Sequence, residues 1–405
     1  MSTKESRLIL KCIKKQNWDK MKEVYKGKWE EIDKALGSLI GAGIGDSTGS
    51  RLEFLGHKPK EEEVKEALLM PGGGIWGVSS GQLTDDTEMA LSLAHALVNP
   101  INTSNSKFNI NSIAYYYSFW FKSKPFDIGN TTKKAISFIS NLNPTDPNLA
   151  NLMIQNSLKV NIKSKANGSL MRATPLAIWG YKLPVLQLAE CAKRESQLTH
   201  PNPTCCDAVA SYVIACSHLI TNQEDNKGAF NKAYNWVKNQ GNKEVIEWLD
   251  LAKQDINIPF YPEQGFIKIA FIHAFRHLFL GTDFLQALKC ILEGGGDTDT
   301  NAAIVCGLLG AFHGISRLPH HMVSTLLNCN FQNGVIRPLE FLPSLIPYYV
   351  RVLLEKAPDD LEKKEKEKEK IQNLNQNLNQ IQNLNQENNL YVNLEILDKI
   401  QHKEL

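Results

Sequence analysis

The distribution of apolar residues along the chain predicts helices through its central part. Between residues 28 and 357, apolar side chains recur at helical spacing, for example in the stretches 89–97 and 302–312. Strand-like alternation of apolar and polar positions is scarce. Because residues three and four positions apart share one face of an α-helix, this pattern predicts a single all-α domain over residues 28–357.

The segment before this domain has a different composition. Residues 1–27 are rich in lysine and weakly apolar, so we interpret them as an N-terminal extension. Its apolar residues Leu8, Ile9 and Leu10 are candidates for a small docking patch.

The segment after the domain, residues 358–405, changes character more sharply. A Lys/Glu run at 362–370 is followed by repeats of Ile/Leu-Gln-Asn-Leu-Asn-Gln up to Gln386. Such a composition cannot bury a core, so we expect a disordered, low-complexity C-terminal tail. A short coiled coil, and with it self-association, is the alternative, because four apolar residues follow 3,4,3 spacing: Ile371, Leu374, Leu378 and Ile381.

Two series of glycines stand out inside the predicted helices. Glycine costs about 1 kcal/mol relative to alanine in a helix interior, so its repeated use needs a reason. Close approach of two central helices provides that reason, and we expect the two series to lie where these helices touch. The glycines are Gly37, Gly41 and Gly45, then Gly307, Gly310 and Gly314.

Composition excludes some classes of partner. The 405 residues are 42% hydrophobic, which is enough for one large core or two modest ones. Lysine plus arginine (45) nearly balances aspartate plus glutamate (43), so no global field attracts nucleic acid or an anionic membrane. The N-terminus has no signal-peptide pattern, and no apolar run approaches the ~20 residues of a membrane helix. We therefore expect a cytoplasmic protein without a nucleic-acid or membrane partner.

The cysteines show none of the paired spacing of zinc sites. Most lie within apolar stretches, where a thiol packs as a small hydrophobic group. We expect all of them to be reduced and structural: Cys12, Cys191, Cys205, Cys206, Cys216, Cys290, Cys306 and Cys329.

Candidate chemistry is concentrated in two short acidic segments. Glycine-rich loops at 72–74 and 294–296 lead into Thr84-Asp85-Asp86 and Asp297-Thr298-Asp299-Thr300, and an apolar helical pattern follows each. Thr and Asp are favoured N-caps, and Asp85 with Glu88 resembles a capping box, so capping is an even alternative for either segment alone.

Capping does not explain carboxylates that are so close together. Two like charges ~4 Å apart repel by about 4 kcal/mol at an effective dielectric of 20, and a helix N-terminus offsets only about 0.3–1 kcal/mol. A bound cation removes this conflict. Oxygen ligands favour a hard ion, Mg²⁺ or Mn²⁺, over zinc. Four aspartates are enough for two such ions, which would orient a substrate and activate water for hydrolysis.

Five motifs extend this interpretation: Gly45-Asp46-Ser47-Thr48-Gly49-Ser50-Arg51-Leu52-Glu53, Thr84-Asp85-Asp86-Thr87, Asn167-Gly168-Ser169-Leu170-Met171-Arg172, Thr199-His200-Pro201 and Gly295-Gly296-Asp297-Thr298-Asp299-Thr300. In order and spacing they resemble the ADP-ribosylglycohydrolase family, which includes the dinitrogenase reductase-activating glycohydrolase and the ADP-ribosylarginine hydrolases. The resemblance runs from about Ile32 to Pro319 and implies a single all-α orthogonal bundle with two Mg²⁺ or Mn²⁺ ions in a central cleft.

The resemblance also implies a role for individual residues. Glu53 and Asp86 are the candidate catalytic bases, although Glu53 without the family would be a solvated surface carboxylate. The implied metal ligands are Glu53, Thr84, Asp85, Asp86, Asp297, Asp299 and Thr300. The implied contacts to ADP-ribose are Asp127, Gly129, Asn130, Thr131, Ser164, Asn167, Gly168, Ser169, His200, Gly295 and Gly296.

Some of these assignments have a structural alternative. Without the family, the loop at Gly129 is a turn with an N-cap, and a lone histidine such as His200 is more often structural. Arg172 we interpret as a buried structural partner. Leu83 and Glu88 depart from the aromatic and the glutamine common in the family, which leaves the metal ligands intact but puts the shape of the pocket in doubt.

The resemblance implies hydrolysis of the glycosidic bond between ADP-ribose and a protein side chain. Arginine is the most plausible acceptor residue, and an ADP-ribosylated protein and ADP-ribose are the expected partners. An O-linked ADP-ribosyl-serine bond or a small ADP-ribose conjugate is the rival substrate. A silent ADP-ribose-binding or structural member is the rival from another class, against which the intact aspartates argue.

Overall fold

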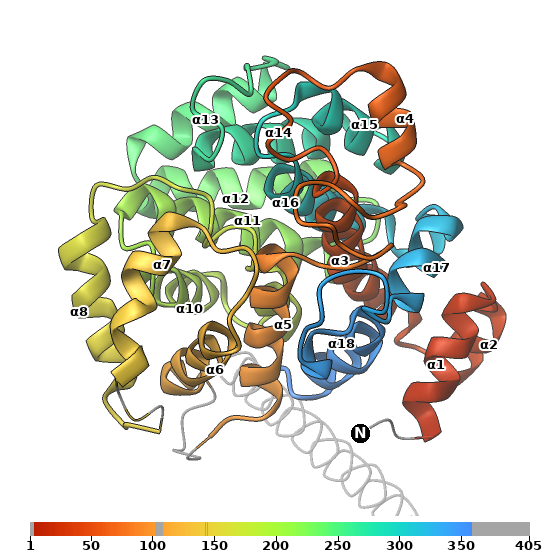
Figure 1. Ribbon diagram of the computed structural model, residues 1–405, viewed down its shortest axis with the longest axis horizontal. Helices are drawn as coiled ribbons and strands as arrows, with labels where there is room; N and C mark the ends of the chain where they lie inside the picture. The colour runs from red at the N-terminus through yellow and green to blue at the C-terminus, as the bar shows by residue number, and fades with distance from the viewer. Residues whose placement is uncertain (1–3, 102–107, 142, 144, 359–405) are drawn as a thin grey trace, which may run out of the picture. The chain divides into compact units, whose positions relative to one another are not determined.

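The computed structural model describes residues 4–101, 108–141, 143 and 145–358, and within them the protein consists of helices without a β-strand (Figure 1). The prediction of an all-α fold is confirmed. The longer helices are α1 (Lys4–Lys14), α3 (Trp29–Gly49), α5 (Asp85–Val98), α6 (Ile110–Lys122), α8 (Leu149–Asn161), α10 (Val185–Gln197), α11 (Pro203–Thr221), α12 (Asn226–Gln240), α13 (Lys243–Lys253), α14 (Ile267–Leu280), α15 (Phe284–Gly294), α16 (Thr298–His313) and α18 (Ile346–Glu355). The shorter ones are α2 (Trp18–Val24), α4 (Glu61–Ala67), α7 (Asn130–Ile136), α9 (Thr174–Trp179), α17 (His320–Asn328) and the 3-10 helices η1 (Ser137–Asn141), η2 (Ile315–Arg317), η3 (Leu339–Phe341) and η4 (Pro343–Leu345).

The chain divides into one unit up to Pro358 and a second from Asp359 to Leu405. The second unit, with the predicted tail and its coiled-coil alternative, lies outside the described residues. The predicted N-terminal extension contributes to the main core, because Ile9, Ile13 and Met21 are buried in the same apolar cluster as the central helices. The expected docking patch is therefore largely used internally: Leu8 is 38% exposed, whereas Ile9 is 2% exposed.

Five of the six glycines lie where α3 and α16 meet, as predicted, whereas Gly307 makes room for Tyr212 of α11 and Thr174 of α9. A Cβ atom added to Gly41 would lie 2.4 Å from the carbonyl oxygen of Cys306, and one added to Gly45 would lie 2.3 Å from that of Ala302. A Cβ on Gly310 would be 2.0 Å from the carbonyl oxygen of Gly37. Only glycine allows the two backbones to approach this closely, so the pair forms a rigid centre for the domain.

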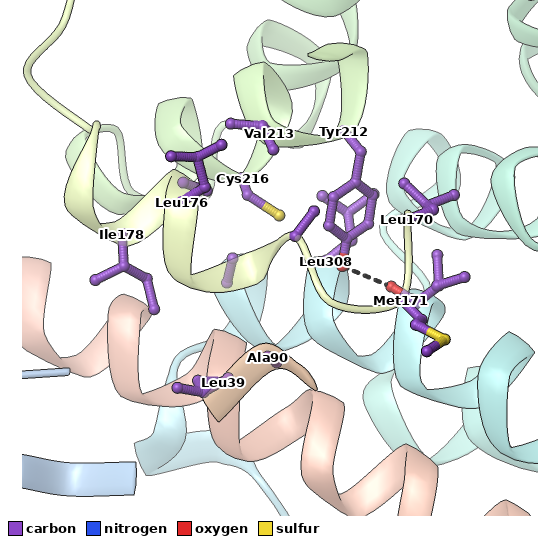
Figure 2. Packing of buried hydrophobic residues seen from close by; sticks show 14 of the residues in the cluster. Leu39, Ala90, Leu170, Met171, Leu176, Ile178, Tyr212, Val213, Cys216 and Leu308 are labelled. Atoms are coloured by element: carbon purple, nitrogen blue, oxygen red, sulfur yellow. Dashed lines mark hydrogen bonds between the residues drawn. The ribbon is translucent and has the colours of Figure 1, made fainter. Parts of the chain in front are cut away.

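The core surrounds this helix pair on several sides. Figure 2 shows Tyr212 of α11 among Leu170, Met171 and Leu308, and its hydroxyl donates a hydrogen bond of 2.8 Å to the carbonyl oxygen of Ile304. Its side chain is fully buried, so this bond satisfies a hydroxyl that would otherwise be costly to desolvate.

Helix α11 is long and apolar enough to cross a membrane by length and composition, which the sequence pattern had not led us to expect. Within the described residues it is the one such helix, and 89% of its apolar window is buried inside the protein. This burial is typical of the core helix of a globular domain.

All eight cysteines are free, as expected. Six are buried, and two are only partly exposed: Cys191 and Cys290.

Candidate active site

The end of α3 meets the first turn of α16. The hydroxyl of Thr298 donates a hydrogen bond of 2.7 Å to the carbonyl oxygen of Gly49. This contact brings Glu53, which follows α3, next to the acidic residues that begin α16. One carboxylate oxygen from each of Glu53, Asp297 and Asp299 lies within 4.8 Å of the others. Glu53 is only 6% exposed, so it is not the solvated surface carboxylate considered as its alternative.

The two acidic segments do not act as helix caps. Thr84 and Asp297 occupy the N-cap positions of α5 and α16, but neither side chain accepts a capping hydrogen bond. The hydroxyl of Thr84 instead lies 2.8 Å from Asp46 Oδ1 and 2.9 Å from Asp86 Oδ2. A single hydroxyl hydrogen cannot serve both carboxylates at once. Capping therefore fails to account for either segment, and the repulsion between the carboxylates has to be relieved by a counter-charge or by protonation.

Burial and mutual repulsion raise the pKa of several carboxyl groups in this cluster. Burial, followed by the charge of Asp127, raises the pKa of Glu53 to about 8. Burial raises the pKa of Asp299 well above its ordinary value, and the charges of Glu53 and Asp86 act in the same direction. The pKa of Asp85 is likewise raised by burial and by Asp127. The cluster therefore lacks compensating positive charge from the protein itself.

The residues present fit a hard divalent cation. Asp86 is fully buried, and its Oδ1 atom has no hydrogen-bond partner in the protein. The atoms near this cluster that could bind a metal are carboxylate, hydroxyl or amide oxygens, which Mg²⁺ and Mn²⁺ prefer as ligands. Glu53, Asp297 and Asp299 form the one group of acidic, histidine or cysteine side chains in the described residues whose ligand atoms converge closely enough to hold an ion.

The acidic cluster opens into a cavity of about 330 Å³. The cavity combines predicted metal ligands with predicted substrate contacts, which come from six separate parts of the sequence. The predicted residues that line it are Glu53, Asp85, Asp127, Gly129, Asn130, Thr131, Asn167, Gly168, His200, Asp297, Asp299 and Thr300.

Other predicted residues do not line this cavity. Thr84 and Asp86 are fully buried behind its acidic end, where they bond each other. Ser169 is also fully buried and accepts a hydrogen bond from Ser196. Ser164 lies against Thr131, at 2.9 Å between the hydroxyl oxygens, and reaches the cavity only through it.

The two predicted glycine contacts, Gly295 and Gly296, face a different part of the surface. The amide of Gly296 donates to the hydroxyl of Tyr261, at 2.9 Å, and Gly296 lines a neighbouring cavity with Phe54 and Gln264. Both glycines have positive φ angles, 75° and 78°, which a side chain would strain. Their direct effect in this structure is to shape the turn that delivers Asp297.

The loop at Gly129 differs from the expectation in one detail. Its amide donates to Asp85 Oδ2 at 3.3 Å instead of pointing freely into the cavity. A Cβ atom on Gly129 would meet nothing within 4 Å. The adjacent Asn130 and Thr131, which begin α7, do line the cavity. A role of this loop in ADP-ribose binding stays a prediction.

His200 also lines the cavity, and buried side chains hold its ring in place. Arg172, fully buried, donates to Glu195 Oε1 at 2.7 Å and to Thr199 Oγ1 at 2.8 Å, so its predicted structural role is confirmed. Thr199 Oγ1 also lies 2.7 Å from His200 Nδ1, and the tautomer of the ring decides which of the two atoms donates. His200 Nε2 has no hydrogen-bond partner in the protein. Burial lowers the pKa of His200 well below its ordinary value, which keeps the ring neutral.

Trp76 is a residue of this site that the sequence did not single out. Its indole N–H donates to Glu53 Oε2 at 2.9 Å, and its ring lies 6.0 Å from that of Phe126, next to Asp127. Asp46 was also missed; it accepts hydrogen bonds from the backbone amides of Thr84 and Thr87. Asp46 stands inside the first motif, whereas the glycine-rich loop around Trp76 gave no sign of its contact with Glu53.

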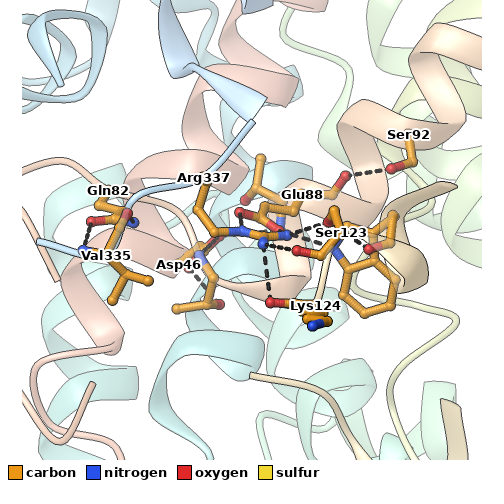
Figure 3. Close-up of polar contacts among 11 residues, drawn as sticks. Asp46, Gln82, Glu88, Ser92, Ser123, Lys124, Val335 and Arg337 are labelled. Carbon is orange, nitrogen blue, oxygen red and sulfur yellow. Dashed lines mark hydrogen bonds and ion pairs between the residues drawn. The ribbon is translucent and has the colours of Figure 1, made fainter. Parts of the chain in front are cut away.

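Glu88, one of the two departures from the family pattern, does not enter the cavity. It forms a buried ion pair with Arg337, whose Nη2 lies 2.8 Å from Glu88 Oε2 (Figure 3). The acidic side chain thus has its own charge partner, so this departure does not alter the cavity wall directly.

Comparisons with known proteins agree with this geometry. The sequence model of the family named ADP-ribosylglycohydrolase matches residues 29–366. This chain belongs to the ADP-ribosylglycohydrolase family. It is 26% identical over 295 residues to the ADP-ribosyl-[dinitrogen reductase] glycohydrolase of Rhodospirillum rubrum, covering 73% of this chain and 90% of the relative. It is 26% identical over 316 residues to the ADP-ribosylarginine hydrolase Tri1 of Pseudomonas putida, covering 73% and 74%.

A solved structure supports the fold of this ADP-ribosylglycohydrolase family member. A chain of an ADP-ribosylglycohydrolase-related protein complex superimposes with a TM-score of 0.62 at 21% identity. The match covers 81% of this chain and 99% of the other. The family match extends beyond Pro319, the expected end of the resemblance, and so includes α17, α18 and the segment that carries Arg337.

Proposed function

We propose that this protein is a metal-dependent hydrolase that cleaves the N-glycosidic bond of ADP-ribosyl-arginine in a modified protein and releases ADP-ribose. One observation carries the proposal: a cluster of buried carboxylates without compensating charge lies at one end of a cavity that also contains Asn167, Gly168 and His200. The names of the relatives from Rhodospirillum rubrum and Pseudomonas putida support the substrate class.

Glu53, Asp85, Asp297, Asp299 and Thr300 are the cavity-lining residues that would hold Mg²⁺ or Mn²⁺. Two ions are proposed, as the number of carboxylates allows, with Thr84 and Asp86 completing the set from behind. A bound divalent ion supplies positive charge that orients substrate oxygens and makes water more acidic.

Glu53 is the better placed of the two candidate bases. It lines the cavity, whereas Asp86 is buried behind it. In the proposed reaction, the Glu53 carboxylate takes the proton of a water that attacks the anomeric carbon of the distal ribose. The bond to the arginine guanidinium breaks through an oxocarbenium-like state, as in other glycoside hydrolysis. The arginine leaves as a neutral guanidine and takes up the proton that Glu53 received from water. The indole N–H of Trp76 fixes the orientation of Glu53.

The rest of the cavity is proposed to bind the ADP half of the substrate. Asn167 Nδ2 donates to Asp297 Oδ2 at 2.7 Å, which connects the acidic end to the His200 end. In the tautomer in which Thr199 donates to Nδ1, the Nε2–H of a neutral His200 would be a donor suited to a phosphate or ribose oxygen. A cytoplasmic location, an ADP-ribosylated protein as partner and self-association through the tail remain parts of the proposal that rest on sequence.

The decisive experiment offers arginine-linked and serine-linked ADP-ribosyl peptides side by side to the purified protein. With Mg²⁺ or Mn²⁺, we expect free ADP-ribose from the arginine-linked peptide, and none in EDTA or with D299A. Release only from the serine-linked peptide would overturn the proposed linkage. Tight ADP-ribose binding without release from either peptide would identify a silent binding protein.

A further inference from the structure

Residues 331–338, which follow α17, contact the residues on both sides of the first acidic segment, and none of them lines the cavity. We call these residues the C-terminal brace. Gln82, just before this acidic segment, is fully buried, and its side-chain amide bonds both backbone groups of Val335. Gln82 Nε2 donates to the Val335 carbonyl oxygen at 2.6 Å, and the Val335 amide donates to Gln82 Oε1 at 3.1 Å (Figure 3).

Arg337 of the brace holds the other side of the same segment. Its Nε and Nη2 atoms donate to the two carboxylate oxygens of Glu88, each at 2.8 Å. Two parallel bonds of this kind fix direction as well as distance. Glu88 Oε2 also accepts from the indole of Trp120 at 2.9 Å, so the carboxylate itself is held in place.

The remaining donors of Arg337 reach a third element, the end of α6. Nη1 donates to the carbonyl oxygens of Ser123 and Lys124 at 2.9 and 3.2 Å, and Nη2 donates to Ser123 Oγ at 2.8 Å. Arg337 as a whole residue is 5% exposed. Its guanidinium makes five hydrogen bonds, which matches its five N–H groups. A surface arginine has no need of such complete satisfaction.

The elements that Arg337 connects are the two that flank Asp85. Gln82 and Glu88 bracket the residues from Thr84 to Asp86, whereas Ser123 and Lys124 lead directly into Asp127 and Gly129. Asp85 accepts a hydrogen bond from the Gly129 amide, so these two walls touch each other inside the cavity. A shift of either wall at Arg337 therefore changes the separation of the carboxylates of Asp85 and Asp127.

We propose that Arg337 is a positioning residue for the ion site. It contacts neither the cavity nor the acidic cluster, and it acts through Glu88 and the Ser123–Lys124 backbone. The inference rests on the proposed function for its link to turnover, but its effect on ion binding is measurable separately. Residues around metal ligands orient them, and their replacement typically weakens metal binding about 10- to 100-fold.

A purely structural ion pair is the competing interpretation, and a double variant distinguishes the two. Removing one member of a buried pair leaves an unpaired charge, whereas replacing both members with groups of similar volume is often neutral for stability. E88Q/R337M removes both charges and keeps an acceptor for Trp120, but the carbonyl groups of Ser123 and Lys124 still lose their donor. If Arg337 positions the ion site, the double variant should be more stable than R337M but should bind the ion as weakly as R337M does.

The test measures binding of Mn²⁺ alone to the full chain, with the free ion followed by electron paramagnetic resonance. We expect R337M and E88Q/R337M to bind Mn²⁺ about 10- to 100-fold more weakly than the wild type. The affinity of R337K should lie between that of these two variants and that of the wild type. The control is R276M, which breaks a more exposed arginine–carboxylate pair, with Asp255. Neither residue lines the cavity, so R276M should leave Mn²⁺ binding unchanged.

Wild-type Mn²⁺ binding by a stable E88Q/R337M protein would overturn the inference, and so would equal weakening in R276M. If R337M does not fold, Mn²⁺ binding by R337K and by the double variant tests the inference in its place. Turnover is assayed in parallel on the arginine-linked peptide. A wild type that binds Mn²⁺ but releases no ADP-ribose would contradict the proposed function alone, and the effect of R337M on Mn²⁺ binding would still decide the role of Arg337.

Discussion

Thr298 donates its hydroxyl hydrogen to the carbonyl oxygen of Gly49 across 2.7 Å, at the point where α3 ends and α16 begins. A Cβ atom on Gly49 would lie 2.4 Å from the Thr298 carbonyl oxygen and 2.5 Å from Asp299 Cα. The position of Asp299 relative to Glu53 thus depends on a backbone contact that only glycine permits.

G49A should therefore both destabilise the protein and impair hydrolysis. Both clashing groups are backbone, so α16 has to move, and overpacking of this kind costs about 1–3 kcal/mol. The free energy of unfolding from urea titration measures the first effect, and ADP-ribose release measures the second. G129A is the control for stability, because a Cβ there meets nothing within 4 Å and φ is −59°. Equal stability of G49A and wild type would contradict the close helix packing.

The ion-free protein should lose stability as the pH rises. Burial raises the pKa of Asp46 and Asp127 from 3.8 to about 6 and that of Glu53 from 4.5 to about 8. Groups whose pKa is raised on folding favour the folded state below their unfolded pKa, and this contribution is lost as the pH rises through the folded value. Melting temperatures in EDTA should therefore fall between about pH 4 and pH 8.

Mg²⁺ should reverse much of this loss, because a ligand that binds only the folded state stabilises it. The E53Q variant, which removes the group with the pKa of about 8, should show a smaller loss between pH 6 and pH 8 in EDTA. A melting temperature in EDTA that rises over the same range would show that the carboxylates are compensated by the protein itself.

W76F should lower turnover more than substrate binding. The substitution keeps an aromatic ring near Phe126 but removes the N–H that donates to Glu53 at 2.9 Å. Hydrogen bonds to charged groups contribute about 1.5–3 kcal/mol, so we expect kcat to fall at least about tenfold while KM changes little. Steady-state kinetics on the arginine-linked peptide measure both, and W18F, in the N-terminal helix α2, is the control. An unchanged kcat would show that Glu53 needs no orientation by Trp76.

G168A should weaken ADP-ribose binding. A Cβ at Gly168 would lie 2.9 Å from Cε1 and 3.0 Å from Nε2 of His200, so the buried ring would have to turn away from the cavity. A loss of about 1.4 kcal/mol, or tenfold in Kd, is the expected size by isothermal titration calorimetry. G265A is the control, because Gly265 lines the same cavity. Its added Cβ would lie 3.5 Å from Asp297 Oδ2, an ordinary contact, so G265A should weaken ADP-ribose binding less than G168A does. Equal effects of the two variants would argue against a role for His200.

Local pattern in the sequence was sufficient for the helical fold and for much of the site. The 3.6-residue periodicity of apolar positions depends only on neighbours along the chain, so the all-α fold was predictable. The glycine series around Gly41 and Gly310 identified the central helix crossing, because glycine inside a helix is costly unless two backbones have to approach closely. The acidic segments and the family resemblance located most residues that line the cavity, from Glu53 to Thr300.

Only the tertiary structure decided which of these groups face the cavity. Thr84 and Asp86 belong to the same motif as Asp85, yet they are buried behind it, because the first turn of α5 directs successive side chains to different sides. The contacts of Glu53 with Trp76 and of Glu88 with Arg337 join residues 23 and 249 positions apart. Such contacts leave no periodic signal along the chain, since they depend on how separate helices and loops pack in three dimensions. The sequence alone thus determined the fold and the kind of chemistry, and packing determined which carboxylates can take part in it.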